Sequence, residues 1–169
     1  MLEKKKILAL FDALNSALRK KGEIGEIGIV RGSAMCLVYN ARASTKDVDA
    51  IFSPASTIRR LAAQLAEEHG VEKDWLNDGV KGYLEGTFKR EAVLDFSHLR
   101  IWTPEPRYML AMKCISARWD SLDRKDVLFL IKLLKIKTAQ HVFKIIEGYY
   151  PKHRIPAKTQ FFLEELFEK

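Results

Sequence analysis

The sequence predicts an α+β protein in which a small mixed sheet with helices is followed by a helical C-terminal part. Two observations lead to this prediction. Over residues 1–105, short apolar runs rich in β-branched residues alternate with segments whose apolar residues recur at helical spacing. From Arg107 onward the helical pattern continues alone. We therefore expect a core over residues 1–105 and a helical region over 106–169, packed on the core as one unit.

The first elements follow from the order of apolar and turn residues. Residues 3–20 carry apolar side chains at helical spacing and predict an amphipathic helix. The apolar run at 27–30 predicts a buried strand. Gly32 and Ser33 then predict a turn, which leads into a short helix over 34–40.

The next segment predicts a second strand and a second long helix. Residues 47–52 alternate and then become apolar, which is typical of a strand. Residues 56–70 follow the helical pattern, with Ser56 or Thr57 near the N-cap and Gly70 past the end.

Further strands are expected around residues 92–96 and 99–102, before prolines interrupt the chain. Four helices are expected in the remainder, at residues 107–118, 121–136, 138–150 and 157–169.

Composition excludes several classes of protein. Hydrophobic residues make up 47% of the 169 residues, which is enough for a core and argues against disorder. The N-terminal stretch is not a signal peptide, because Asp12 interrupts its apolar run, and no run approaches the roughly 18 residues of a spanning helix. Cys36 and Cys114 give neither a disulfide framework nor a zinc site. We therefore expect a cytoplasmic protein without a membrane partner.

The net charge of +7 is concentrated in one part of the chain. Residues 113–158 contain 11 Lys or Arg and 4 Asp or Glu, whereas the remainder contains 18 of each. Such a basic half indicates a phosphate-rich partner such as RNA, or else a solvated helical face. The sequence leaves both interpretations open.

Asp47 and Asp49 form the most informative pair of residues. On a strand, residues two apart point to the same face, so both carboxylates are expected to project together. Two such carboxylates repel each other unless a cation lies between them. Mg²⁺ prefers oxygen ligands and commonly takes one or two carboxylates together with substrate phosphates. The pair therefore predicts a magnesium site.

Donors for phosphate surround this pair in the sequence. Gly32 lets a phosphate approach the backbone, and Ser33 adds a hydroxyl at the expected helix start. Arg42, Thr45 and Lys46 add further donors next to the carboxylates. Together these residues predict a site that holds a nucleoside triphosphate and transfers a phosphoryl or nucleotidyl group.

The stretch RGSAMCLVYNARASTKDVDAIF (31–52) resembles the DNA polymerase β-like nucleotidyltransferase superfamily, whose signature is a Gly-Ser followed by a strand-borne D-x-D. More narrowly, it is similar to the AbiEii-like branch, which includes toxins of toxin–antitoxin systems. The helices YMLAMKCISAR and DSLDRKDVLFL match later parts of that pattern, so the resemblance covers roughly residues 25–135. It implies a polymerase-β-like core with Asp47 and Asp49 as Mg²⁺ ligands.

The same resemblance implies further roles. Gly32 and Ser33 would lie at the triphosphate, and Lys113 would reach its phosphates, although a lysine in an apolar helix also commonly snorkels. Arg118 would contact phosphate or pair with Asp123 or Asp126. Those two acids are also placed to offset a helix dipole.

Two positions depart from the family pattern. Arg31 stands where the family usually has its first Gly, and its side chain would either bind phosphate or crowd the pocket. A third carboxylate, the general base of many members, is expected at Asp95, or second at Glu91; an Asp at a strand end is the alternative.

The expected function is Mg²⁺-dependent transfer of a nucleoside monophosphate from a nucleoside triphosphate to a hydroxyl of RNA, particularly tRNA, or of a protein. The resemblance adds a toxin–antitoxin or phage-defence role and a cognate antitoxin as partner. The alternative is an inactive module of the same fold that binds nucleotide, RNA or a protein.

Overall fold

A computed structural model of the chain describes residues 1–168, with the side chain of Ser121 excepted. The described chain divides into two compact units. The first consists of residues 1–81 and 90–104, and the second of residues 82–89 and the chain from Glu105 onward. Segment 82–89, which the sequence analysis placed in the core, belongs to the second unit because the backbone carbonyls of Tyr83 and Glu85 accept hydrogen bonds from tyrosines of that unit.

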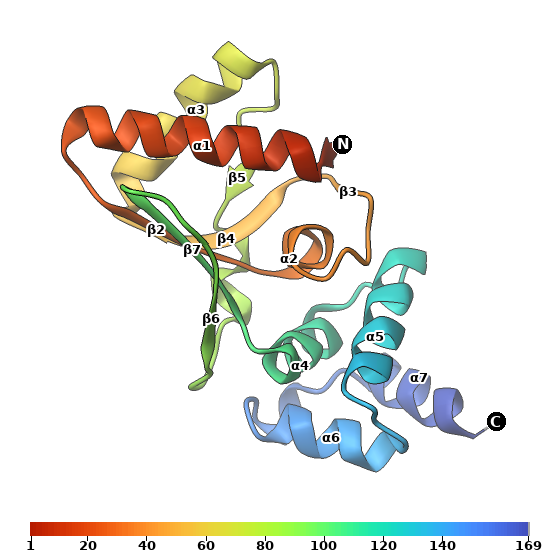
Figure 1. Ribbon diagram of the computed structural model, residues 1–169. Helices are drawn as coiled ribbons and strands as arrows, with labels where there is room; N and C mark the ends of the chain where they lie inside the picture. Colours follow the sequence, from red (N-terminus) through yellow and green to blue (C-terminus); the bar gives the residue numbers. More distant parts are fainter. Residues whose placement is uncertain (169) are drawn as a thin grey trace. The chain divides into compact units, whose positions relative to one another are not determined.

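A five-stranded mixed sheet forms the first unit (Figure 1). Its strand order is β5-β4-β2-β7-β6. β2 runs antiparallel to β4 and parallel to β7, while β5 is parallel to β4 and β6 is antiparallel to β7. The bounds are β2 Gly25–Ile29, β4 Val48–Ser53, β5 Leu76–Asn77, β6 Arg90–Asp95 and β7 Leu99–Pro104. The strands expected at 27–30, 47–52, 92–96 and 99–102 are confirmed to within two residues.

Two helices, α1 (Lys4–Lys21) and α3 (Ala55–His69), pack on one face of this sheet (Figure 1). Alternate strand residues turn to that face and are buried, as the period of two requires. The core that results contains Ile7, Leu10, Phe11, Leu14, Leu18, Ile27, Ile29, Val48, Ala50, Ile58, Leu99 and Ile101. The face opposite α1 and α3 is called the open face of the sheet.

α3 begins one residue before its predicted start. Pro54 is the N-cap residue, and Ser56 and Thr57 lie in the first turn, near the N-cap as predicted. The extended conformation of Pro54 (φ −67°, ψ 126°) precedes the first turn, and its carbonyl accepts the N–H of Ile58 at 3.0 Å. Gly70 ends the helix with φ 62°, as predicted.

A short helix, α2 (Arg31–Leu37), follows β2 directly. The turn expected at Gly32 and Ser33 is therefore the first turn of the helix itself. A two-stranded sheet pairs β1 (Leu2–Glu3) with β3 (Ser44–Thr45). That pairing was not predicted, because a two-residue strand is too short to show an alternation of apolar and polar residues.

The second unit contains four helices, as predicted: α4 (Pro106–Ser116), α5 (Ser121–Leu133), α6 (Ala139–Glu147) and α7 (Ala157–Phe167). Side chains cap two of them. Asp120 accepts the N–H groups of Leu122 and Asp123, and Thr138 accepts the N–H of His141. Short 3₁₀ turns lie at η1 (Gly79–Tyr83) and η2 (Lys152–Arg154). Within residues 1–168, no helix combines the length and the apolar character needed to cross a membrane.

Candidate functional site

The two candidate metal ligands lie at the beginning of β4. Val48 and Ala50 are buried on the helix-covered face, so Asp49 between them projects to the opposite, open face. Asp47 directly precedes the strand and has the same parity as Asp49. Both acids are half-buried. The structure therefore keeps the predicted pair next to each other in the first unit.

The junction of β2 and α2 is fastened to this strand. The N–H of Val30 donates to the carbonyl oxygen of Asp49 at 3.0 Å. The hydroxyl of Ser33, which is fully buried, donates to the carbonyl of Val30 at 2.7 Å and lies 3.3 Å from the carbonyl oxygen of Asp49. Ser33 thus positions the helix start against β4, and its hydroxyl is turned to backbone in this structure.

Gly32 allows two side chains to approach its backbone closely. A Cβ atom at this position would lie 2.7 Å from Oγ1 of Thr45 and 3.1 Å from Nη1 of Arg42. The Thr45 hydroxyl in turn donates to the carbonyl of Asp47 at 3.1 Å. Predicted site residues 13 positions apart in sequence therefore meet at the α2 backbone, and only glycine leaves room for them. Lys46 is exposed, in the bend between Thr45 and Asp47.

Arg31 is the residue whose role the sequence left open. Its Nη1 lies 3.7 Å from Oδ2 of Asp49, and the two side chains are 21% and 19% exposed. Its backbone has φ 56°, the left-handed conformation that glycine adopts without strain. The departure from the family's glycine therefore places a guanidinium against a predicted metal ligand.

A tryptophan and an arginine occupy the open face next to the pair. Gly28 of β2 pairs with Ile51 of β4 and Trp102 of β7, and Ile51 lies two residues from Asp49, so all four face the same side. A Cβ at Gly28 would lie 2.3 Å from the Trp102 ring, so the indole covers this glycine. The Arg90 guanidinium stacks 4.1 Å from the ring centroid. Neither Trp102 nor Arg90 is among the site residues predicted from the sequence.

Glu91, the second candidate for the third carboxylate, belongs to the other face. It pairs with buried Thr103 and alternates with Arg90 along β6. Burial, and secondarily the negative charge of Glu91, raises the pKa of Tyr39 to about 12. The electrostatic partner of Glu91 is therefore a tyrosine that follows α2, and its carboxylate does not point the way Asp49 does.

Asp95, the first candidate, lies far from the pair. It pairs with Arg100, which is level with Glu26 of β2 and Ser53 of β4. Three strand spacings separate β6 from β4, about 14 Å, and four residues separate Ser53 from Asp49, about 13 Å. Asp95 is 80% exposed and lies 3.7 Å from Arg100. The structure does not bring Asp95 together with Asp47 and Asp49.

Lys113 and Arg118 belong to the second unit. Lys113 is 2% exposed, and its Nζ lies 2.5 Å from Asp126 and 3.3 Å from Asp123. The backbone N–H of Arg118 donates to Asp123 at 2.8 Å, while its side chain is exposed. Within this unit the amine of Lys113 is matched by carboxylates, and its expected contact with phosphate stays a prediction.

Asp47 and Asp49 fit a magnesium ion only when other ligands complete its coordination. Among the described residues, no group of three or more His, Cys, Asp or Glu side chains is placed to hold a metal ion. The site itself offers two hard carboxylates, Asp47 and Asp49. Mg²⁺ is commonly bound by one or two carboxylates when substrate phosphates and waters complete its coordination. The residues therefore fit an ion held jointly with a triphosphate, and not by the protein alone.

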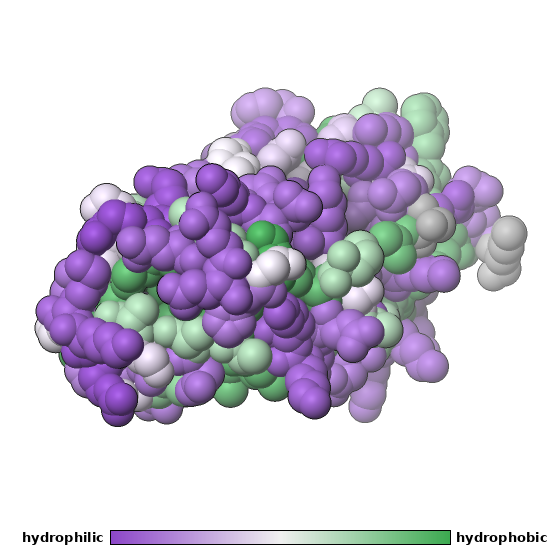
Figure 2. Space-filling model, turned by 90° about the horizontal axis from the view of Figure 1, so that it is seen from above, coloured by the Kyte–Doolittle hydropathy of each residue, from purple (hydrophilic) through white to green (hydrophobic). Residues whose placement is uncertain are grey.

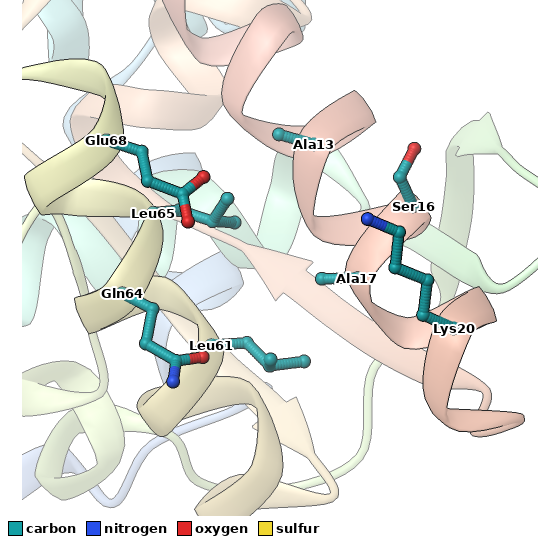
Figure 3. A pocket seen from close by; sticks show the side chains of 8 residues that line it. All are labelled: Ala13, Ser16, Ala17, Lys20, Leu61, Gln64, Leu65 and Glu68. Atoms are coloured by element: carbon teal, nitrogen blue, oxygen red, sulfur yellow. The ribbon is translucent and has the colours of Figure 1, made fainter.

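A separate pocket of about 250 Å³ lies between α1 and α3 (Figure 3). The small side chains of Ala13, Ser16 and Ala17 on α1 leave the space, and Lys20 and Glu68 border it. Seen from that side, the molecule is largely hydrophilic with hydrophobic patches between the polar groups (Figure 2). None of the predicted site residues lines this pocket, so we assign it no part in the candidate site.

Comparison with known proteins gives one match. A family model described as "Nucleotidyltransferase of unknown function (DUF6036)" matches residues 5–148. No curated protein and no solved structure matches the chain significantly. The matched region includes the carboxylate pair, Gly32 and most of the second unit. The chain belongs to this family of nucleotidyltransferases.

Proposed function

We propose that the chain is a Mg²⁺-dependent nucleotidyltransferase, which moves a nucleoside monophosphate from a nucleoside triphosphate to an acceptor hydroxyl. The observation that carries the proposal is the position of Asp49 on the open face of β4, with Asp47 before it and with Thr45 and Arg42 gathered at the Gly32 backbone. Membership of a nucleotidyltransferase family supports the reaction class.

The residues divide into two groups by charge. Asp47 and Asp49 would hold Mg²⁺ together with the phosphates, and the ion supplies charge neutralisation at the phosphate oxygens. Arg42, beside the Gly32 backbone, and exposed Lys46 would bind and orient the phosphates. Arg31 would leave Asp49 and turn to the same phosphates once the metal takes its place.

The step itself is an in-line substitution at the α-phosphorus. The acceptor oxygen forms a new bond to this phosphorus, and the bond to the bridging oxygen breaks, so that pyrophosphate leaves. The acceptor proton goes to a base. Neither Asp95 nor Glu91 is placed to take it, so we assign this role to the carboxylate pair or to solvent.

The ion pair between Arg31 and Asp49 also favours a second candidate function. A chain with two carboxylates, and with Arg31 on one of them, would bind a nucleotide without transferring it. Nucleotide affinity without turnover distinguishes this binding module from the enzyme.

The test uses α-³²P-labelled nucleoside triphosphates with Mg²⁺, total RNA and the protein itself as acceptors. Label on an acceptor is expected from the wild type and not from Asp47→Asn/Asp49→Asn. Asp95→Asn, which alters an exposed carboxylate far from the pair, serves as matched control and is expected to transfer normally. Absence of label from folded wild type, with nucleotide binding retained, would establish the binding module instead.

The AbiEii-like pattern of residues 31–52 extends the proposal to a toxin role with a protein antitoxin. Induced expression of the wild type is then expected to slow growth of a bacterial host, while Asp47→Asn/Asp49→Asn at equal expression does not. Growth that is unaffected by an active wild-type enzyme would count against the toxin role and leave the enzymatic proposal standing.

A further inference from the structure

The surface of the second unit is more basic than its sequence. Between residues 121 and 146 the acidic residues are Asp123 and Asp126. Both are buried, at 7% and 1% exposure, against the buried amine of Lys113. The structure thus withdraws both acids of residues 121–146 from solvent, while Glu147, the last residue of α6, is exposed. The exposed charged residues of 121–146 are Arg124, Lys125, Lys132, Lys135, Lys137 and Lys144.

Five of these lysines follow one another over two helices. Lys125 and Lys132 are seven residues apart on the exposed side of α5, which is two helical turns. Lys135 and Lys137 lie in the connection between the helices, and Lys144 is exposed on α6. We call these five lysines the basic surface. The α5–α6 corner is visible in Figure 1.

Lys135 occupies a backbone position that favours glycine. Its φ is 55°, and the turn is closed by hydrogen bonds from its own N–H to the carbonyl of Lys132 and from Ile136 to Ile131. An L-residue in this conformation is strained, and glycine is the usual residue after a helix end. The chain therefore keeps a lysine at a position where the backbone conformation favours glycine, which has no side chain.

We propose that the basic surface binds the phosphate backbone of RNA. Clustered lysines that neutralise phosphates release condensed counterions, which gives affinity without base specificity. RNA also offers the hydroxyl that the proposed transfer requires, and in this respect the inference rests on the proposed function. A lipid surface is the competing partner, because α5 also exposes Leu122, Leu128 and Leu133; RNA is favoured because it alone offers that hydroxyl, and vesicles serve as the comparison in the test.

The test is binding of a fluorescently labelled RNA hairpin with a single-stranded 3′ end, followed by anisotropy between 50 and 300 mM KCl in EDTA without nucleotide. The patch variant is Lys132→Gln/Lys137→Gln/Lys144→Gln. The control is Lys5→Gln/Lys20→Gln/Lys21→Gln, which removes the same charge from exposed positions of α1. We expect at least a roughly tenfold loss of affinity for the patch variant at 100 mM KCl and a salt slope lower by about 2. The control should stay within about twofold of the wild type.

Lys135→Gly is a second variant that separates charge from folding. It should weaken RNA binding by roughly threefold, while thermal stability stays the same or rises, because glycine relieves the strained φ. Wild type that does not bind at 50 mM KCl, or equal losses in the patch and control variants, would overturn the proposal. So would patch-dependent binding to vesicles containing phosphatidylserine with no effect on RNA.

The expected RNA affinity does not depend on the proposed catalysis. Asp47→Asn/Asp49→Asn should bind RNA as the wild type does, since the basic surface and the carboxylates belong to different units. RNA binding without transfer would support the basic surface and count against the enzyme. Transfer to RNA by the patch variant at undiminished kcat/KM would overturn the basic surface and leave the enzyme standing.

Discussion

The guanidinium of Arg31 lies 3.7 Å from the carboxylate of Asp49, and Arg31 reaches it from a left-handed backbone conformation with φ 56°. Both side chains are about one-fifth exposed. The chain thus supplies its own positive charge to the strand-borne acid that is predicted to bind a metal. Backbone strain and an ion pair meet in one residue, so substitutions can separate the two.

Arg31→Gly should leave the protein as stable as the wild type or raise its free energy of unfolding by up to about 1 kcal/mol. Glycine relieves roughly 1–2 kcal/mol of left-handed strain, while the lost ion pair is worth about 0–1 kcal/mol. Urea unfolding measured by circular dichroism checks this. Arg31→Ala loses the same ion pair without relief of the strain and should be about 1 kcal/mol less stable than Arg31→Gly. Equal stability of the two variants would show that φ is not strained there.

Arg31→Gly should also bind Mn²⁺, as a spectroscopic substitute for Mg²⁺, more tightly than the wild type. The guanidinium repels a cation at Asp49 and must be displaced, so its removal should tighten binding by about fivefold or more, the equivalent of roughly 1 kcal/mol. Electron paramagnetic resonance of free Mn²⁺ measures this without turnover. Arg31→Lys keeps the charge and is the matched control. Identical affinities for all three proteins would mean that Arg31 does not compete with a metal.

Most helices and strands could be predicted from the sequence, because each is long enough for its hydrophobic periodicity to be recognised. The helix over 3–20 and the four C-terminal helices all appear within a few residues of their expected bounds. The difference lies where tertiary context decides. Segment 82–89 joins the second unit through hydrogen bonds to distant tyrosines.

Only the local part of the candidate site was predictable. Gly32, Thr45 and Asp47 lie within one stretch of 16 residues, and the structure keeps them close in space. Asp95 was chosen from residue type and strand context, but strand order and register place it at a distant point of the sheet. Because register depends on pairing across several strands, no local pattern could have located it. The stacking of Arg90 on Trp102 could not be predicted for the same reason.

Lys113→Met should destabilise the protein by about 3–5 kcal/mol. The substitution removes the positive partner of Asp123 and Asp126 and leaves buried carboxylates without compensation. Urea unfolding at pH 7 measures the loss. The control is Lys125→Met, which alters an exposed lysine in the same unit and should cost less than about 0.5 kcal/mol. If Lys113→Met costs no more than this control, the buried cluster does not stabilise the second unit.

Tyr149 should make the stability of the second unit depend on alkaline pH. Burial and the hydrogen bond that its hydroxyl donates to Glu105 at 2.8 Å raise the pKa of Tyr149 to about 12. The pKa of an unfolded tyrosine is about 10, so the folded state holds this proton more tightly. Its contribution to stability is therefore complete below pH 10 and is lost as the pH rises through about 12.

Comparison of Tyr149→Phe with the wild type isolates this effect from the titration of lysines. The variant should be less stable than the wild type at pH 8, since it lacks the bond to Glu105, and the difference should shrink between pH 10 and 12. Glu105→Gln removes the carboxylate that contributes to the raised pKa, so its tyrosine should ionise at lower pH in a titration followed at 295 nm. A difference between Tyr149→Phe and wild type that stays constant from pH 8 to 12 would show that the Tyr149 proton is not held by the fold.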